Sequence, residues 1–489
     1  MKILFATSEI YPFVKTGGLA DVCGALPPVL HQLGAEVRLF LPGYDAILKN
    51  LKHPCQIAKY NGIGTIQDAR ILFGILEHPD GHFPPTPCYV FDSPQLFAAR
   101  HPYIDEHGRD WPDNHIRFGA FCHAAANLIH YDPMWQADLI HGHDWQCGLI
   151  PLYSQRLASP PAGEIPKFLF TIHNIAYQGL FDNWHMAGLG LSWDDFTPTG
   201  LEFFDRISFL KAGINYADFI TTVSPTYARE ICETDLGCGL QGVFQDRRDH
   251  LCGILNGIDT QVWNPAHDPY IAKNYSFETI TKKIDNRKSL IKEFDLRIPT
   301  DRPLFGIISR LTPQKGFDLV LKITPQLIAE KCALIVLGNG DKDLESGFLA
   351  LQEQFPHQVK IINAYNEIFA HKIHAGADCI LMPSRMEPCG LVQLYAMRYG
   401  TPPLVRDTGG LADSVEAYQG DDNNSSITAT GFKFYRDDAA DLLQSCQSVI
   451  QSFAVPKVWK TLCINAMRAD FSWDISARAY LDLYKKLIG

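Results

Sequence analysis

Short apolar segments alternate with helical stretches along this chain, and the alternation occurs in two separate series. We expect strands at residues 3–6, 37–41, 139–140, 168–172 and 219–223 in the first series, and at 304–308, 333–337, 359–362, 379–382 and 403–405 in the second. Strands that alternate with helices favour parallel sheets. Two such series therefore predict an α/β protein with two Rossmann-like, doubly wound domains.

The boundary between the series is a stretch rich in turn residues, at positions 256–274. A chain of 489 residues is long enough for two or three domains. We predict an N-terminal domain at 1–258, a C-terminal domain at 259–468, and a final helix within 469–489 that packs back on the N-terminal domain. The polar run 420–426 is expected to be an exposed loop.

Charge and cysteine content exclude several classes of protein. The net charge of −11 disfavours binding to nucleic acid or to an anionic membrane. The 13 cysteines are scattered and form no C-x-x-C pair, which disfavours a disulfide framework and favours a cytoplasmic protein. We expect no signal peptide and no membrane-spanning segment.

One hexapeptide, Thr-Gly-Gly-Leu-Ala-Asp, occurs twice, at residues 16–21 and 408–413. Both copies follow a predicted strand and open a predicted helix, so their backbone N–H groups are suited to an anion. Neither copy fits G-x-G-x-x-G, and the fingerprint of a nicotinamide cofactor is therefore absent. Lys15 precedes the first copy and is either a diphosphate ligand or a solvated surface cation.

Charged residues also follow two strands of the second series. Arg310 and Lys315 come after the strand at 304–308, where open α/β sheets bind ligands. Two cations at this place could neutralise a diphosphate. Glu387 follows the strand at 379–382 and precedes Pro388. Its carboxylate either faces a ligand or is a structural charge at a helix start.

Histidines at strand ends leave a metal site open as an alternative. The run His141-Gly142-His143-Asp144 resembles a ligand set, but the sequence shows no third-ligand motif. Asp341-Lys342-Asp343 could imitate a D-x-D metal motif or be a solvated loop. His173 ends another strand and is either a ligand contact or a buried, hydrogen-bonded histidine. We expect no metal.

The order of these motifs resembles that of bacterial glycogen synthase and plant starch synthase. The likeness includes Lys-Thr-Gly-Gly-Leu-Ala-Asp, His-x-His-Asp-Trp, Thr-Ile-His-Asn, Asn-Gly-Ile-Asp, Ser-Arg-Leu-x-x-Gln-Lys-Gly and Glu-Pro-Cys-Gly-Leu, and it extends over the whole chain. It implies a retaining GT-B glycosyltransferase with two Rossmann-like domains facing across a cleft. Such enzymes transfer glucose from ADP-glucose to the non-reducing end of an α-1,4-glucan, glycogen or maltodextrin, and need no cofactor.

The resemblance also assigns roles to individual residues. Arg310 and Lys315 would hold the donor diphosphate. The residues that would reach the donor from the other domain are Lys15, Gly17 and Gly18. Those that would surround the donor glucose and its phosphate are Glu387, Cys389, Gly390 and Leu391. The resemblance further implies that His173 contacts a glucose hydroxyl and that Asp144 lies near it. Asn256 would line the cleft, and Tyr365 would contact the nucleoside.

One position departs from the family pattern. Val392 stands where the family usually has Thr, which removes one hydroxyl contact to a donor phosphate and predicts weaker donor binding. Three alternatives remain open: a UDP-glucose-dependent synthase, another GT-B activity such as a phosphorylase, and a non-catalytic glucan-binding protein. A phosphorylase would need a pyridoxal-phosphate lysine, and no motif here supplies that pattern.

Overall fold

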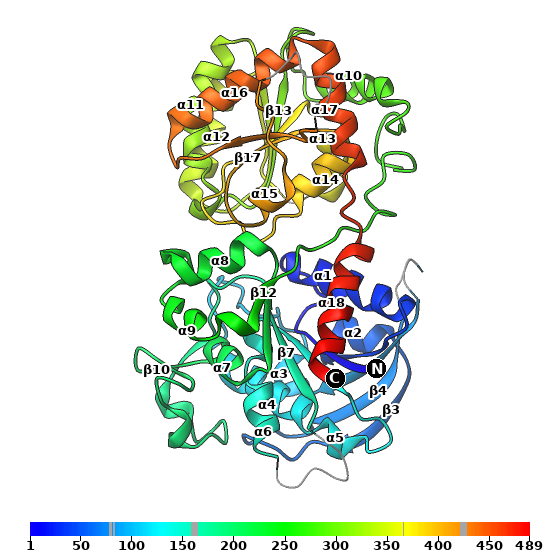
Figure 1. Cartoon of the computed structure of the whole chain (residues 1–489), viewed down its shortest axis with the longest axis vertical. Helices are drawn as coiled ribbons and strands as arrows, with labels where there is room; N and C mark the ends of the chain where they lie inside the picture. The colour runs from blue at the N-terminus through cyan, green and yellow to red at the C-terminus, as the bar shows by residue number, and fades with distance from the viewer. Residues whose placement is uncertain (78–80, 82–83, 158–164, 365, 421–427) are drawn as a thin grey trace. The chain divides into compact units, whose positions relative to one another are not determined.

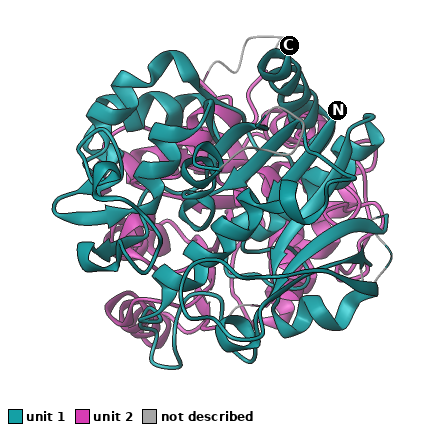
Figure 2. Ribbon diagram, turned by 90° about the horizontal axis from the view of Figure 1, so that it is seen from below, with its two compact units in different colours: residues 1–257, 473–489 teal, residues 258–472 magenta. Residues whose placement is uncertain are grey.

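The computed structural model describes residues 1–77, 81, 84–157, 165–364, 366–420 and 428–489. It divides into two compact units, Met1–Gly257 with Trp473–Gly489 and Ile258–Ser472. Figure 2 colours the two units and shows that the N- and C-termini both belong to unit 1. The domain boundaries predicted from the sequence are 258 and 468. Residues 469–472 belong to unit 2, where Ile258 donates its N–H to the carbonyl of Phe471.

Unit 1 is built on a nine-stranded sheet with the order β12-β11-β7-β6-β1-β2-β5-β4-β3. Its strands are β1 (Lys2–Ala6), β2 (Glu36–Pro42), β3 (Leu51–Lys59), β4 (Arg70–Leu76), β5 (Thr86–Asp92), β6 (Leu139–His143), β7 (Lys167–Ile172), β11 (Phe219–Thr222) and β12 (Leu251–Gly253). The strands from β12 to β5 run parallel, whereas β4 and β3 are antiparallel additions at one edge. The chain passes from β1 to β2 in one direction and to β6 in the other, so the sheet is doubly wound.

The helices of unit 1 lie around this sheet (Figure 1). They are α1 (Gly18–Gln32), α2 (Asp45–Asn50), α3 (Pro94–Phe97), α4 (Asn114–Ala126), α5 (Leu128–Tyr131), α6 (Ile150–Gln155), α7 (Phe209–Tyr216), α8 (Pro225–Glu233), α9 (Gln241–Asp246) and α18 (Trp473–Ile488). The C-terminal helix α18 packs beside α1. A separate three-stranded sheet joins β8 (Leu180–Asp182), β10 (Arg206–Ser208) and β9 (Glu202–Phe203).

Unit 2 contains a six-stranded parallel sheet with the order β15-β14-β13-β16-β17-β18. Its strands are β13 (Leu304–Ile308), β14 (Ala333–Leu337), β15 (Val359–Ile362), β16 (Cys379–Met382), β17 (Pro403–Arg406) and β18 (Phe432–Phe434). Its helices are α10 (Lys283–Glu293), α11 (Phe317–Ala329), α12 (Lys342–Gln354), α13 (Glu367–Gly376), α14 (Val392–Arg398), α15 (Gly409–Ser414), α16 (Ala439–Phe453) and α17 (Pro456–Arg468).

The burial pattern of β14 shows that helices cover both faces of the unit 2 sheet. Leu334 and Val336 belong to one hydrophobic cluster, whereas Ala333, Ile335 and Leu337 belong to another. Successive side chains of a strand point to opposite faces, so each cluster fills one face. Helices α11 and α16 contribute to the first cluster, and α13 and α14 to the second. This two-sided burial explains why the strands are continuous apolar runs in the sequence.

Candidate active site

In unit 1, three of the sequence-predicted residues follow neighbouring strands. The strands β1, β6 and β7 are adjacent and parallel. Lys15 lies in the loop after β1, Asp144 directly follows β6, and His173 directly follows β7. The carboxyl ends of parallel strands meet at one edge of a sheet, and the change of winding direction between β1 and β6 opens a crevice there. The structure therefore places all three residues at the same edge of unit 1.

The glycine-rich loop before α1 is held by a buried carboxylate that the sequence analysis did not identify. Glu9 is only 2% exposed. Its Oε2 accepts the backbone N–H of Thr16 at 2.5 Å, and its Oε1 accepts the hydroxyls of Thr16 and Tyr103, each at 2.6 Å. The sequence does contain one indication of a role for Glu9, because it is a single charged residue in a mostly apolar segment shortly after the strand β1. Beside it, Lys15 Nζ lies 2.7 Å from Asp21 Oδ1.

Asp144 holds the backbone of His173. Asp144 has a left-handed backbone conformation, with φ of 55°, which is strained for a residue other than glycine. Its Oδ1 accepts the backbone N–H of His173 at 2.7 Å. Burial raises the pKa of Asp144 to about 7, although this hydrogen bond opposes the shift. Burial also lowers the pKa of His173 to about 3, so this imidazole is neutral at physiological pH.

Asn256 follows β12 near the end of the N-terminal segment of unit 1. Its side chain is 5% exposed, and among the described residues its Oδ1 has no hydrogen-bond partner. Buried amide oxygens are nearly always bonded. The amide oxygen is thus an acceptor that a ligand could satisfy, and the assignment of Asn256 to a binding site stays a prediction.

In unit 2, the predicted residues follow two strands on either side of the second change of winding direction. The strands β13 and β16 are adjacent and parallel, and β13 is also followed in the chain by β14 on its other side. Arg310 and Lys315 lie in the loop after β13, and Glu387 lies in the loop after β16. The sheet therefore brings the two cations and the carboxylate to one crevice edge.

Lys315 and Glu387 are in direct contact. Lys315 Nζ donates to Glu387 Oε2 at 2.6 Å, and the hydroxyl of Ser384 donates to the same oxygen at 2.8 Å. The Glu387 side chain is 8% exposed and that of Lys315 is 20% exposed. Arg310 is exposed. The carboxylate of Glu387 is thus held in a defined position, rather than solvated at a helix start.

Arg385 locks the two loops together, and the sequence analysis missed it as well. Its guanidinium binds Asp318 through two hydrogen bonds, at 2.7 and 3.0 Å, and also donates to the carbonyl of Pro313. The hydrogen bond from Arg385 lowers the pKa of Asp318. Bidentate pairs of this kind are geometrically specific. Arg385 therefore fixes the loop of Lys315 against the loop of Glu387.

The second glycine pair supports the backbone of Glu387. The N–H of Gly410 donates to the carbonyls of Glu387 and Pro388, at 3.0 and 3.2 Å. The sequence predicts that the helix start after Gly410 stabilises an anion. That N–H is already bonded to the protein, and α15 spans only six residues. This part of the expectation is corrected, because the loop uses the group for its own structure.

Three other predicted donor residues follow Glu387 in the same loop. Cys389 is 5% exposed, Gly390 has φ of 71°, and Leu391 precedes α14, whose first residue is Val392. Tyr365 lies outside the described residues, as do positions 421–426 of the expected polar loop.

The alternative metal motifs have structural partners. Asp341 caps α12, since its Oδ1 accepts the N–H groups of Asp343 and Leu344 at 3.0 and 3.2 Å. In the part of the chain that the structure describes, no group of three or more His, Cys, Asp or Glu side chains is arranged to hold a metal ion.

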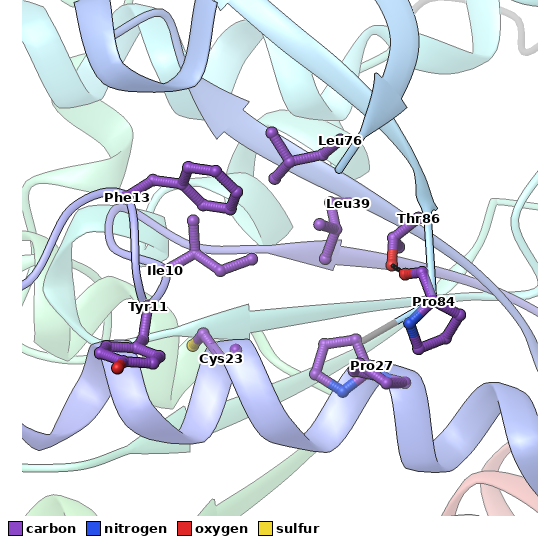
Figure 3. Close-up of a pocket in the computed structure, with 11 residues that line it drawn as sticks. Ile10, Tyr11, Phe13, Cys23, Pro27, Leu39, Leu76, Pro84 and Thr86 are labelled. Atoms are coloured by element: carbon purple, nitrogen blue, oxygen red, sulfur yellow. Dashed lines mark hydrogen bonds between the residues drawn. The ribbon is translucent and has the colours of Figure 1, made fainter. Parts of the chain in front are cut away.

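Unit 1 also contains a small pocket (Figure 3). It is lined by Ile10, Tyr11, Phe13, Cys23, Gly24, Pro27, Pro28, Leu39, Leu76, Pro84 and Thr86. None of the lining side chains is charged, so the pocket offers nothing to neutralise a diphosphate. Over the described ranges, no helix is both long enough and apolar enough to cross a membrane.

Comparison with known proteins identifies the family. Residues 2–246 match the starch synthase catalytic domain, and residues 289–457 match the glycosyl transferases group 1 family. A glycogen synthase 2 from Nitrosococcus oceani is 44% identical over 100% of this chain and 97% of its own length. A glycogen synthase from Roseobacter denitrificans is 43% identical over 100% of both chains.

Solved structures give the same result. The catalytic domain of starch synthase IV from Arabidopsis thaliana, bound to ADP and acarbose, has a TM-score of 0.85 at 30% identity and covers 100% of this chain and 99% of that chain. Sucrose-phosphate synthase from Thermosynechococcus elongatus shares the fold, with a TM-score of 0.59 at 17% identity over 99% of this chain and 98% of that chain.

Two Rossmann-like halves with charged loops at their strand ends define a glycosyltransferase of the GT-B class, which confirms the fold class expected from the sequence. The chain belongs to the glycogen synthase and starch synthase family, and it is a hexosyltransferase.

Proposed function

We propose that the protein extends an α-1,4-glucan, glycogen or maltodextrin, by transferring glucose from ADP-glucose to its non-reducing end with retention of configuration and release of ADP. The observation that carries the proposal is the fixed Lys315–Glu387 pair at the crevice edge of unit 2, in a chain that matches glycogen synthases over its full length. The ADP in the related starch synthase structure supports the choice of nucleotide. The scattered cysteines support a cytoplasmic location.

The chemistry follows from the charges that develop when the glucose–phosphate bond breaks. Negative charge grows on the nucleoside diphosphate, where Arg310 and Lys315 would stabilise it electrostatically. Positive charge grows on the sugar ring, which the carboxylate of Glu387 would favour. Because Lys315 already contacts Glu387, a bound diphosphate would share this ammonium with the carboxylate. The two opposite charges would then be arranged as the transition state needs them.

Retention is proposed to occur on one face of the sugar. A two-step retaining glycosidase uses two carboxylates that flank the bond. Among the described residues, Glu387 is bonded by Lys315 and Ser384, and we propose that no second carboxylate acts with it. We therefore propose that the leaving phosphate itself accepts the proton of the glucan hydroxyl. We also propose which other residues contact the substrates. In unit 1 they are Lys15, Gly17, Gly18, His173, Asp144 and Asn256. In unit 2 they are Cys389, Gly390, Leu391 and Tyr365.

A turnover assay with glycogen tests the proposal, comparing ADP-glucose and UDP-glucose at equal concentrations. We expect glucose incorporation with ADP-glucose and much slower incorporation with UDP-glucose. A preference for UDP-glucose would support the alternative donor. Binding of glycogen with no release of either nucleotide would support the non-catalytic alternative and contradict the proposal.

A further inference from the structure

The two histidines of the His-x-His motif have different hydrogen-bond partners. His141 uses both ring nitrogens, since Nδ1 lies 2.8 Å from the hydroxyl of Tyr484 and Nε2 lies 2.6 Å from that of Thr171. His143, two residues later on β6, is 0% exposed. Its Nδ1 lies 3.0 Å from Nε2 of His173. Its Nε2 has no hydrogen-bond partner among the described residues.

The direction of the hydrogen bond between His143 and His173 follows from this unpartnered nitrogen. Burial lowers the pKa of both residues, so both rings are neutral and one donates to the other. If His173 donated, His143 would carry its proton on Nε2, as a buried N–H without an acceptor. If His143 donates from Nδ1, its Nε2 carries no proton and has only a lone pair without a hydrogen-bond partner. Orphaned buried N–H groups are the rarer of the two situations, so His143 is the donor.

The surroundings of His143 offer its Nε2 no acceptor. The rings of Phe5 and His141 pack against it, with centroids 4.3 and 4.1 Å away and tilts of 38° and 41°. Phe5 has no polar atom, and both nitrogens of His141 are already bonded. Neither of these neighbouring rings therefore accepts a hydrogen bond from Nε2 of His143, which again makes His143 the donor to His173.

We propose that His143 is a positioning residue that fixes the tautomer of His173. By donating Nδ1–H to Nε2 of His173, it places the single proton of His173 on Nδ1. No hydrogen bond within the described residues involves Nδ1 of His173, and this side chain is only partly buried. His173 then presents an N–H donor to a hydroxyl oxygen of the transferred sugar. The step from tautomer to sugar rests on the proposed function.

The adjacent residue completes the arrangement. Asp144 accepts the backbone N–H of His173, while His143 binds its ring. Two consecutive residues thus fix both the backbone and the side chain of His173. This explains why histidine and aspartate occur side by side in the motif without forming a metal site.

The first test is the tautomer itself, measured by ¹⁵N NMR on protein labelled at histidine, with the His173 signals assigned by their loss in His173→Asn. We expect the proton of His173 on Nδ1 in the wild-type protein. His143→Leu should give a mixture of tautomers, whereas His143→Asn, whose amide nitrogen lies near the position of Nδ1, should retain the wild-type state. The matched control His141→Asn alters a neighbour of equal burial and should leave His173 unchanged. A wild-type His173 protonated on Nε2 would overturn the proposal.

The second test is kinetic and uses the same variants. Loss of one hydrogen bond in His143→Leu should lower kcat/KM for ADP-glucose by about 5- to 10-fold, and His143→Asn should recover most of this loss. Equal losses in both variants, with folding intact, would mean that the ring only fills space. If the wild-type protein releases no ADP, the proposed function fails, while the NMR result still decides the tautomer.

Discussion

At the scale of single residues, the environment of each charge separates a functional role from a structural one. Asp341 caps a helix, and Asp318 pairs with Arg385, so both have structural partners. Arg310 is exposed at a strand end, and Lys315 reaches the buried carboxylate of Glu387 from the same loop. A cation next to a carboxylate in a crevice is positioned for chemistry in which opposite charges develop together.

The first prediction concerns these two cations. Arg310→Ala and Lys315→Ala should each lower turnover with ADP-glucose by roughly 10²–10³-fold, the usual effect of removing one preorganised stabilising group. Lys460→Ala is a matched control, because Lys460 is an exposed lysine on α17, away from the loop of Lys315. Near-normal turnover in both variants, with melting temperature unchanged, would show that the loop does not bind the leaving group.

At the scale of elements, the two copies of the hexapeptide have different structural roles. Gly409 has φ of 45°, and a Cβ there would lie 2.0 Å from the carbonyl oxygen of Glu387. Gly17 has an extended backbone with φ of −165°, and a Cβ there would meet nothing within 4 Å. The second copy thus needs glycine for packing, whereas the first has open space that a ligand could use.

This difference gives the second prediction. Gly409→Ala should lower the melting temperature and displace Glu387, because the added methyl group collides with backbone. Gly17→Ala should leave the melting temperature nearly unchanged and reduce activity through the substrate side of the loop. Thermal melts and turnover assays of the two variants measure this contrast. The same stability loss in both would contradict the assignment of different roles.

The buried ionisable groups at the ends of β6 and β7 give the third prediction, on the pH dependence of stability. The pKa of Asp144 is raised to about 7, so its contribution to stability is full below pH 3.8 and is lost as pH rises through 7. The pKa of His173 is lowered to about 3, so its contribution is present above pH 6.5 and is lost as pH falls. The two groups therefore act in opposite directions between pH 4 and 6.5.

Asp144→Asn and His173→Asn separate these contributions. The free energy of unfolding should rise more steeply with pH in Asp144→Asn than in the wild-type protein, and less steeply in His173→Asn, each by about 1.4 kcal/mol per pH unit. Denaturant melts between pH 4 and 6.5 provide the measurement. Slopes equal to that of the wild-type protein would mean that neither group has a shifted pKa.

The sequence predicted ten of the parallel strands, which read as apolar runs, but it missed the parallel strands β5, β12 and β18. It missed β3, whose residues are mostly exposed and include Lys52, Pro54 and Lys59. Such residues protect an edge strand from pairing with further strands, and they interrupt the apolar pattern by which a strand is recognised in a sequence. Glu9 and Arg385 were missed for a different reason. Their roles depend on contacts with Tyr103 and Asp318, far away in the chain, which spacing alone does not reveal.

At the scale of the whole molecule, the chain returns to its first unit at the end. Helix α18 belongs to unit 1, where it buries Trp473, Tyr480 and Tyr484. The hydroxyl of Tyr484 bonds His141, and that of Ser476 donates to the carbonyl of Leu255. The fold of unit 1 therefore needs residues from both ends of the sequence (Figure 2).

The fourth prediction tests this dependence. Deletion of residues 473–489 should unfold unit 1 or lower its melting temperature strongly, because large buried side chains are removed. Tyr484→Phe should cost about 1–3 kcal/mol, since it leaves Nδ1 of His141 unpaired. Lys486→Ala, at an exposed position of the same helix, is the control and should have little effect. A truncated protein with wild-type melting would contradict the role of α18.

The most direct test of the central claim is the rate of glucose incorporation from ADP-glucose into glycogen by wild-type protein and by Glu387→Gln, with melting temperatures measured on the same samples. Glutamine preserves size and hydrogen bonding and removes only the charge. A structural charge is worth about 0.3–1 kcal/mol of stability. We expect an active wild-type protein, and a variant with nearly unchanged melting whose rate is lower by several powers of ten. An inactive wild-type protein, or a variant that retains its rate and loses stability, would contradict the account.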